Sequence, residues 1–384
     1  MYFSTDSTDL YLVLYFIYTK DMKFECKSDV FIKAVAQVSR ARSKQQSQNY
    51  LQDINISLEN HLLTLRATNL ELFCEKSIPV KGIINGHCLL QGETLLRIIS
   101  TLQNINSSLV CAVEDGVFTI TTEQGVIEIK ITPQEDFPTL PPQGEILGVI
   151  SKENLTTLLK EVSFCAATTE IKPEISSVYL YTKNDLIYSV STDSYRLAEK
   201  TLSNEKGIEF SVLIPQKHIG DILQIIQEEK EELTLSLYES IFSISSPNLT
   251  LSIHTITGQF PDYKQLFPKE FTTTVTLTKE ELQKALTLTT YFNETYSQVE
   301  CVFANDKCTL HSRSESVGQV THSIKTSHVG EPIEVKYNNR YFLEVLPYLK
   351  GETITCMFTT PQRPVFLQSK QDASFTYLLM PLTR

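Results

Sequence analysis

One long segment recurs three times along the chain, and this repeat constrains the fold more than any other feature. Each copy opens with a strand-like run, a short polar break and an amphipathic helical run. The copies begin at Lys23, Gly148 and Thr274, so their starts lie 125 and 126 positions apart. In each copy two apolar residues one i,i+4 step apart fall on one helix face: Phe31/Val35, Leu155/Leu159 and Leu282/Leu286.

A second strand–helix unit follows in each copy, in the segments that begin at His87, Ser211 and Glu334. Its helical run again carries matched apolar pairs: Leu95/Ile99, Ile219/Leu223 and Phe342/Leu346. A period this long indicates repeated domains, because solenoid units are far shorter. The sequence therefore predicts three tandem copies of one two-helix domain.

Strand-like runs with alternating polarity follow each second helical run, and turn residues separate them. These turns read Glu114-Asp115-Gly116, Ser246-Pro247-Asn248 and Thr360-Pro361. Two helices lying on antiparallel hairpins form an α+β fold rather than a doubly wound βαβ one. We therefore expect each repeat to be an α+β domain.

Proline-containing phrases end the first two repeats, at residues 136–141 and 259–268. Proline fixes φ and removes a backbone donor, so such phrases end a strand. They predict linkers near 140–148 and 266–272, and domains over 22–142, 146–268 and 269–384. Residues 1–21 are expected to be a dispensable extension; their apolar run, Leu10 to Tyr18, is too short to span a membrane.

Charge and cysteine usage exclude several classes of protein. The formal net charge of -11 argues against a generally basic nucleic-acid binder, although it permits basic residues gathered on one inner surface. The eight cysteines include no CxxC pair and no histidine at metal-ligand spacing. They are expected to be buried free thiols in a reducing compartment, and neither a metal nor a cofactor is predicted.

The common enzyme signatures are missing from the sequence. It contains no GxGxxG, P-loop, HExxH or GxSxG motif. Thr192-Asp193 and Glu135-Asp136 could supply carboxylates for acid–base or metal chemistry, but lone carboxylates beside turns are more often structural. We expect no catalytic activity.

Three further motifs appear in order on the repeat: Thr192-Asp193-Ser194-Tyr195-Arg196-Leu197-Ala198, Gly258-Gln259-Phe260-Pro261-Asp262-Tyr263 and the terminal Tyr377-Leu378-Leu379-Met380-Pro381-Leu382. With them, the chain from Met22 to Arg384 resembles the bacterial DNA polymerase III beta subunit, the sliding clamp. The resemblance implies a head-to-tail homodimer that forms a ring of six domains, each chain supplying half. Duplex DNA would thread the ring without sequence preference, and the ring would tether the replicative polymerase for processive replication.

The resemblance also implies a DNA-facing helical wall and a partner-binding cleft. Basic residues on or beside the helices are the DNA candidates, because Lys and Arg contacts to phosphate carry no base information: Arg40, Arg42, Lys44, Arg97, Lys172 and Lys217. Ordinary solvated helix faces are the alternative for each of them. The cleft, between the second and third domains, would comprise Ile175, Thr192, Ser194, Tyr195, Arg196, Leu197, Pro261, Leu266, Tyr341, Leu379, Met380, Pro381 and Leu382.

The implied partners are the polymerase alpha subunit, an ATP-dependent clamp loader, repair polymerases and other proteins that carry clamp-binding peptides. This chain departs from the family in the first cleft motif, where Ser194-Tyr195 replaces the usual Gly-His. Tyr195 could therefore narrow the pocket and restrict which peptides enter. Without the resemblance, Leu197, Leu379 and Leu382 would be read as plain core.

For the dimer, Ile127 and Ile129 alternate with Glu128 and Lys130 as on an edge strand with one apolar face. By similarity, this edge of the first domain pairs with the third domain of the partner, near Thr290 and Tyr291. The rival reading is a monomeric peptide-binding scaffold that kept the clamp fold and does not encircle DNA. A cytoplasmic, nucleoid-associated location is expected for the clamp, with no membrane partner.

Overall fold

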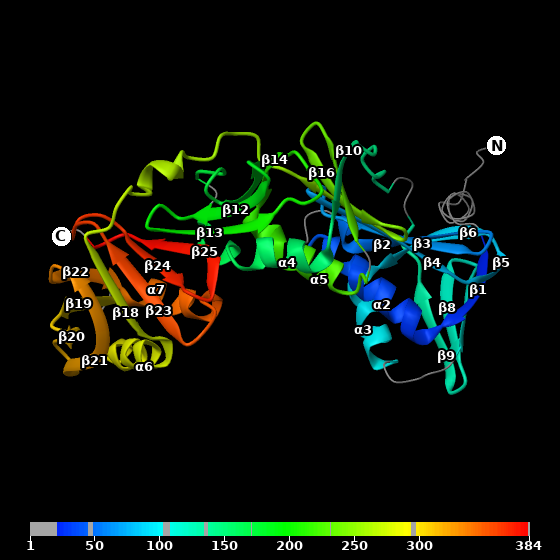
Figure 1. The fold of residues 1–384 in the computed structure, drawn as a ribbon. Helices are drawn as coiled ribbons and strands as arrows, with labels where there is room; N and C mark the ends of the chain where they lie inside the picture. The colour runs from blue at the N-terminus through cyan, green and yellow to red at the C-terminus, as the bar shows by residue number, and fades with distance from the viewer. Residues whose placement is uncertain are drawn as a thin grey trace, which may run out of the picture. The chain divides into compact units, whose positions relative to one another are not determined.

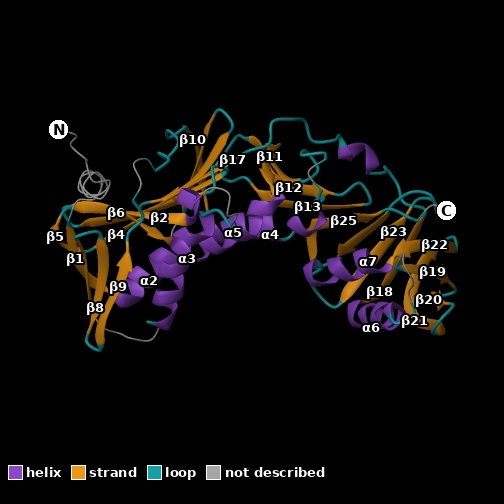
Figure 2. Cartoon of the chain, turned by 180° about the vertical axis from the view of Figure 1, so that it is seen from behind, coloured by secondary structure: helices purple, strands orange, loops and turns teal. Residues whose placement is uncertain are grey.

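The computed structural model describes residues 21–44, 49–102, 108–133, 137–169, 171–230, 232–292 and 297–382. Antiparallel strands dominate this part of the chain, with short helices beside them (Figures 1 and 2). The chain divides into two compact units: residues 1–152 with 220–255, and residues 153–219 with 256–384. Apart from Asp21, the predicted N-terminal extension lies outside the described residues.

The first unit holds the first repeat and part of the second. Its strands are β1 (Met22–Lys27), β2 (Asp53–Glu59), β3 (Leu62–Thr68), β4 (Leu72–Pro79), β5 (Lys81–Ile84), β6 (Gly86–Gln91), β7 (Ser108–Glu114), β8 (Val117–Thr122), β9 (Gly125–Lys130), β10 (Glu145–Ile150), β15 (Leu233–Tyr238), β16 (Ile241–Ser246) and β17 (Leu249–His254). Its helices are α2 (Ser28–Val38) and α3 (Gly92–Thr101), with single 3-10 turns η1 (Ser39–Ala41) and η2 (Asn49–Gln52).

The second unit holds the rest of the second repeat and all of the third. Its strands are β11 (Ser177–Lys183), β12 (Leu186–Thr192), β13 (Arg196–Ser203), β14 (Ser211–Pro215), β18 (Thr273–Thr278), β19 (Gln298–Ala304), β20 (Lys307–Ser314), β21 (Gly318–Gly330), β22 (Ile333–Asn338), β23 (Thr353–Phe358), β24 (Val365–Ser369) and β25 (Asp372–Leu379). Its helices are α6 (Lys279–Thr290) and α7 (Asn339–Val345), with 3-10 turns η3 (Ser163–Cys165), η4 (Tyr263–Leu266) and η5 (Leu346–Tyr348). Helices α4 (Lys152–Lys160) and α5 (Gln216–Gln227) each continue across the division of the chain.

The order of elements confirms the predicted repeat. Each copy runs strand, helix, a three-stranded meander, a strand, a second helix and a second meander, and the first copy has one additional short strand, β5, after its first meander. The matched apolar residues of the first helices are buried, including Phe31, Leu155 and Leu282. The α+β fold class follows, with three tandem copies of one domain.

Neighbouring repeats are joined by strand pairing. In an eight-stranded sheet of the first unit, β17, the last strand of the second repeat, pairs with β4, and Leu251 lies opposite Cys74. In a twelve-stranded sheet of the second unit, β25, the last strand of the third repeat, pairs with β13, and Tyr377 lies opposite Ala198. We call each such pairing of a last strand with the fourth strand of the preceding repeat a joint. The two joints use equivalent strands.

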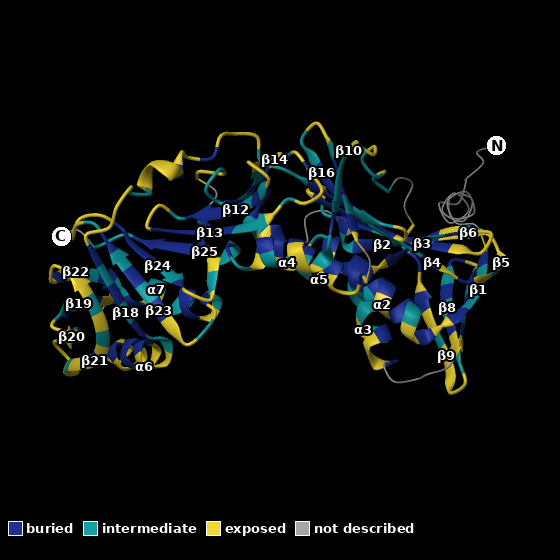
Figure 3. Ribbon diagram, viewed as in Figure 1, coloured by how far each residue is buried: buried dark blue, intermediate teal, exposed yellow. Residues whose placement is uncertain are grey.

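Two strands that are equivalent to strands of the joints have a free edge within the described residues. β9, the last strand of the first repeat, ends a five-stranded sheet and pairs only with β8. β21, the fourth strand of the third repeat, pairs along 318–325 only with β20. Figure 3 shows exposed residues on both strands. The repeat therefore leaves half of a third joint open at each end.

Cysteines and turns match the sequence analysis. All eight cysteines are buried and free. The predicted turn between β7 and β8 places Asp115 and Gly116 at φ of 48° and 76°, left-handed values that suit these residue types. No helix in the described ranges is both long and apolar enough to cross a membrane.

Candidate functional site

The turn between β12 and β13 carries the first cleft motif in a tightly bonded form. Asp193 Oδ1 accepts hydrogen bonds from the backbone N–H groups of Tyr195 and Arg196, at 2.9 and 3.0 Å. The Thr192 hydroxyl accepts from Ser194 N and donates to Arg196 O. Ser194 has a φ of 77°, a region that favours glycine. The turn leaves the Tyr195 side chain 63% exposed.

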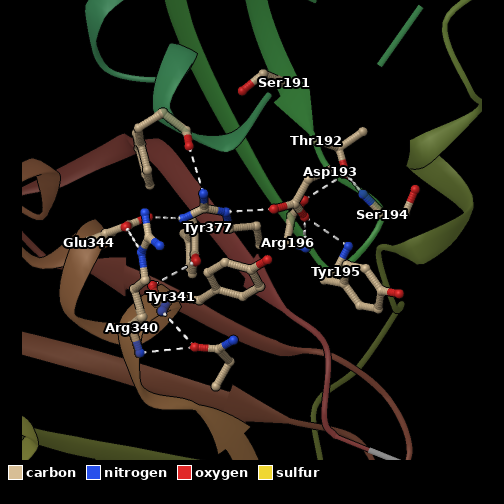
Figure 4. A network of polar contacts seen from close by, with 12 residues as sticks. Ser191, Thr192, Asp193, Ser194, Tyr195, Arg196, Arg340, Tyr341, Glu344 and Tyr377 are labelled. Carbon is tan, nitrogen blue, oxygen red and sulfur yellow. Dashed lines mark hydrogen bonds and ion pairs between the residues drawn. The ribbon is translucent and has the colours of Figure 1, made fainter. Parts of the chain in front are cut away.

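The guanidinium of Arg196 is the centre of a polar network on the same turn (Figure 4). It binds Asp193 Oδ2 at 2.9 Å, donates to Phe164 O at 2.8 Å and pairs with Glu344 of α7. Its side chain is only 8% exposed. Burial acts to raise the pKa of Glu344, but hydrogen bonds from Arg340 and Arg196 hold that pKa below its usual value. Arg196 is therefore fixed in position.

The end of β25 lies beside this turn. Met380 N donates to Tyr195 O at 2.9 Å, and Leu382 N donates to Lys336 O at 2.8 Å. The terminal Met380, Pro381 and Leu382 are therefore ordered by backbone bonds, and their side chains are partly exposed.

Four of the predicted cleft residues are buried: Thr192, Arg196, Leu197 and Leu379. Leu197 and Leu379 are 2% and 0% exposed, so both belong to the core that supports this surface. The Arg196 side chain is also nearly buried, so only a small part of it is accessible to a ligand. The resemblance placed Leu197 and Leu379 in the cleft, whereas the residues alone indicated core, which is where the structure has them.

The segment before β18 runs over the same sheet and brings the second motif to it. Phe260 and Tyr263 pack with Leu197 in one hydrophobic cluster, while Pro261 and Leu266 remain exposed. A Cβ on Gly258 would lie 2.8 Å from the Glu174 side chain, so this segment also passes close to the turn at 172–176. That turn carries the half-buried Ile175.

Tyr341, at the start of α7, completes the group. Its ring centre lies 4.2 Å from the Arg196 guanidinium carbon, and its carbonyl accepts a hydrogen bond from the Tyr377 hydroxyl at 2.8 Å. Tyr195, Pro261, Leu266, Tyr341 and Met380 thus offer accessible apolar surface around a rigid polar core.

No sequence pattern singled out Glu344, which pairs with Arg196, and the position of Asp193 beside a turn indicated only a structural carboxylate. The hydrogen bonds of Asp193 bear out that structural role. The i,i+4 spacing of Arg340 and Glu344 was the available signal, since these two residues form an ion pair on α7.

The DNA candidates differ in the exposure of their side chains and in the ion pairs that they form. Lys44 and Arg97 are 73% and 79% exposed; Lys44 lies 3.5 Å from Asp221, and Arg97 bonds Glu93 at 3.0 Å. Arg40 is exposed on η1. Arg42, predicted as a DNA contact, differs from these residues, because its side chain is 13% exposed and pairs with Glu93. Its charge is already used within the fold. Lys172 and Lys217, in the second unit, are both exposed.

The dimer candidates lie on the open strand β9 and at the end of α6. Ile127 is half-buried on β9, but Ile129 is only 6% exposed and belongs to the core. An Ile129→Asp variant would therefore disturb the fold itself and does not test the interface. The most exposed apolar residue of β9 is Val126, at 60%. Thr290 and Tyr291, at the end of α6, are exposed, Tyr291 to 68%.

Known protein families match this three-repeat architecture. Models of the N-terminal, central and C-terminal domains of the DNA polymerase III beta subunit match residues 22–141, 149–262 and 264–383. The beta sliding clamp of Streptococcus pneumoniae serotype 4 is 24% identical over 373 residues, which cover 94% of this chain and 98% of that protein. That of Synechococcus elongatus is 25% identical over 374 residues, covering 94% of this chain and 99% of its own.

Solved structures share the fold. The beta subunit of Thermotoga maritima DNA polymerase III superposes with a TM-score of 0.89 at 20% identity, covering 94% of this chain and all of that one. The Streptococcus pyogenes beta subunit gives a TM-score of 0.88 at 22% identity and the same coverage. Because the three family models together span almost the whole repeat region, the chain belongs to the DNA polymerase III beta subunit family, the beta sliding clamps.

Proposed function

We propose that this sliding clamp works as a ring of two chains around duplex DNA and tethers a replicative polymerase to it without catalysing a reaction. The observation that carries the proposal is the repeated joint. Equivalent strands pair at both joints within the chain. Among the strands with a free edge in the described part of the chain, β9 and the 318–325 part of β21 are those that a third joint would use. Heterologous pairing of this kind closes a ring when the rotation per domain is right.

Two copies, each offering one open β9 and one open β21, would satisfy both edges. Exposed strand edges are unstable in isolation because they present unpaired N–H and C=O groups. Residues at equivalent positions after the first helices of the second and third repeats also support this arrangement. Phe164 lies twelve residues after the start of α4 and stacks on Tyr348 of the third repeat, with ring centres 4.4 Å apart. Tyr291, the equivalent residue after α6, has its ring exposed.

The DNA contacts would come from Arg40, Lys44, Arg97, Lys172 and Lys217, which are exposed and basic. Such contacts neutralise phosphates and carry no base information, so the ring could slide. The net charge of -11 would repel DNA from the rest of the surface.

Partner peptides would dock beside the Arg196 turn. Tyr195, Pro261, Leu266, Tyr341 and Met380 surround a rigid polar core there, and apolar anchors on a preformed surface supply most of the affinity of such contacts. Polymerase alpha subunit, clamp loader and repair polymerases are the expected ligands. This is the proposed cleft, and residues Ile175, Thr192, Ser194 and Leu382 would frame it.

Retention on circular DNA tests the function. The full chain is loaded onto nicked circular duplex with a clamp loader and ATP, then passed through a gel-filtration column. A ring stays with the circle and is released when a restriction enzyme linearises it. A protein that leaves the circle as fast as the linear form would instead be a scaffold that does not encircle DNA.

A further inference from the structure

The strand registers identify equivalent positions on the fourth strand of each repeat. Opposite the buried residues Leu65, Ser189 and Leu310 lie, respectively, Lys76, Lys200 and His322. The preceding residues are Glu75, Glu199 and Thr321. A Glu-Lys pair thus occurs on the two strands that form joints within the chain, and Thr-His replaces it on the open strand β21.

Both lysines anchor their joints by ion pairs. Lys76 Nζ lies 2.6 Å from Glu229 Oε1, and its side chain is 15% exposed. Glu229 also accepts from Gln37 of α2, at 2.9 Å. At the other joint Lys200, 1% exposed, lies 2.8 Å from both Glu161 and Asp372.

An equivalent polar residue from the first helical segment of a repeat lies at each of these joints. Gln37 of α2 and Glu161, which directly follows α4, both lie nine residues after the start of their helices, at Ser28 and Lys152. Nine residues after Lys279, α6 carries Leu288, which is 37% exposed. The position that carries a polar residue at both internal joints therefore carries an apolar one beside the open strand.

The open strand itself carries almost no permanent charge. From Gly318 to Ile324 β21 contains no Asp, Glu, Lys or Arg, and His322 is exposed. On β9, the residues that match the joint-facing Leu249, Leu251 and Ile253 of β17 are apolar or glycine: Gly125, Ile127 and Ile129. The charged Glu128 and Lys130 alternate with them and face the other side of the sheet.

We propose that the joint between the two copies is held by apolar contact and strand hydrogen bonds, with Leu288 and His322 as its specificity residues, whereas the two joints within each chain are ion-paired. The inference rests on the proposed ring, in which the β9 edge of a second copy pairs with the open part of β21. The surface around Leu288 and His322 accepts that edge because, in the described part of the chain, neither β9 nor β21 from Gly318 to Ile324 brings a buried charge to it. A buried cation without an acid partner would oppose the contact.

Salt dependence of the dimer tests the proposal. Sedimentation of the full chain is measured at 50, 200 and 500 mM NaCl and one fixed pH. An apolar joint predicts that the dimer dissociation constant changes less than about threefold, because salt screens only charged contacts. A dissociation constant that rises tenfold or more contradicts the apolar joint. A monomer at every salt concentration contradicts the ring itself, so the two failures are distinguishable.

Variants then transplant the internal ion pair. His322→Lys and Leu288→Glu are each expected to weaken the dimer about tenfold or more, because each brings one unpaired charge into the joint. The double variant should recover most of the lost dimer affinity, because the two new charges can pair as Glu161 and Lys200 pair at 2.8 Å. Its dimer dissociation constant should then depend on salt. His328→Lys, further along β21, serves as control and should dimerise like the parent. A His322→Lys chain that dimerises normally, or strictly additive effects in the double variant, would overturn the assignment.

Discussion

The Arg196 guanidinium carbon lies 4.2 Å from the centre of the Tyr341 ring, and the same guanidinium pairs with Glu344 one turn further along α7. One arginine of the second repeat therefore binds both an aromatic face and a carboxylate of the third. Such a contact fixes the surface on which a peptide would lie, since neither the turn nor the helix can move without breaking it.

Arg196→Ala should destabilise this joint. The change leaves the side chains of Asp193 and Glu344, 13% and 29% exposed, without their cation, which costs about 3 kcal/mol by analogy with other buried pairs. Chemical denaturation followed by circular dichroism measures the loss. Arg340→Ala is the matched control: this arginine is 74% exposed, and its i,i+4 pair with Glu344 contributes about 0.5 kcal/mol. Equal losses for the two variants would contradict the central role of Arg196.

Tyr195→His should change peptide preference without changing stability. The tyrosine ring is 63% exposed at the edge of the proposed cleft, so its replacement alters the space open to a ligand rather than the core. Fluorescence anisotropy with a panel of clamp-binding peptides is expected to show affinity ratios between peptides that shift about fivefold. Tyr238→His, on an exposed strand end of the first unit, controls for nonspecific effects. Unchanged ratios across the panel would remove Tyr195 from the specificity determinants.

Acid should weaken the joint that holds Asp372. Burial acts to raise the pKa of this carboxyl, but hydrogen bonds from Lys200, Ser374 and Lys350 hold it well below its usual value. A lowered folded-state pKa contributes stability that is complete above the unfolded value, near pH 4, and is lost as the pH falls through the folded value. Asp372→Asn should therefore be less stable at pH 7 and should lose less stability than the parent below pH 4. Parallel stability curves from pH 7 to pH 2 would contradict this account.

Lys44→Ala and Arg97→Ala should weaken DNA binding, each lowering the slope of log affinity against log salt by about 0.9 for one lost phosphate contact. The prediction follows from their exposed charges. Arg42→Ala is the contrasting variant, because its side chain is committed to Glu93. It should leave the salt slope unchanged and lower stability instead. Filter binding or anisotropy with duplex DNA at several salt concentrations separates these outcomes.

The repeat, the helices and the turns could be predicted from sequence because their signals are local. Pairs such as Phe31 and Val35 lie one helical step apart, and Asp115-Gly116 specify their own turn. The joints could not be predicted. Arg196 and Glu344 are 148 positions apart and Lys200 and Asp372 are 172 apart, and no spacing rule connects such residues.

Edge strands show a second limit of sequence reasoning. The alternation at Ile127 and Ile129 correctly indicated an edge strand with one apolar face, and β9 does end its sheet. The pattern could not say whether that face packs within the chain or waits for a partner. Ile129 turns out to be core, and Val126, on the opposite face, is the exposed residue.

Covalent closure of the third joint tests the central claim most directly. The register of β17 on β4, in which Thr250 lies opposite Glu75, places Val126 of one copy opposite Thr321 of the other. All eight native cysteines are buried, so the variant Val126→Cys/Thr321→Cys can be joined selectively with a short bis-maleimide. If the ring exists, cross-linking after loading leaves the protein on closed circular DNA even in denaturant, and cutting the DNA frees a linked dimer. Failure to cross-link between copies, or loss from the closed circle after complete cross-linking, would contradict a ring of two chains around DNA.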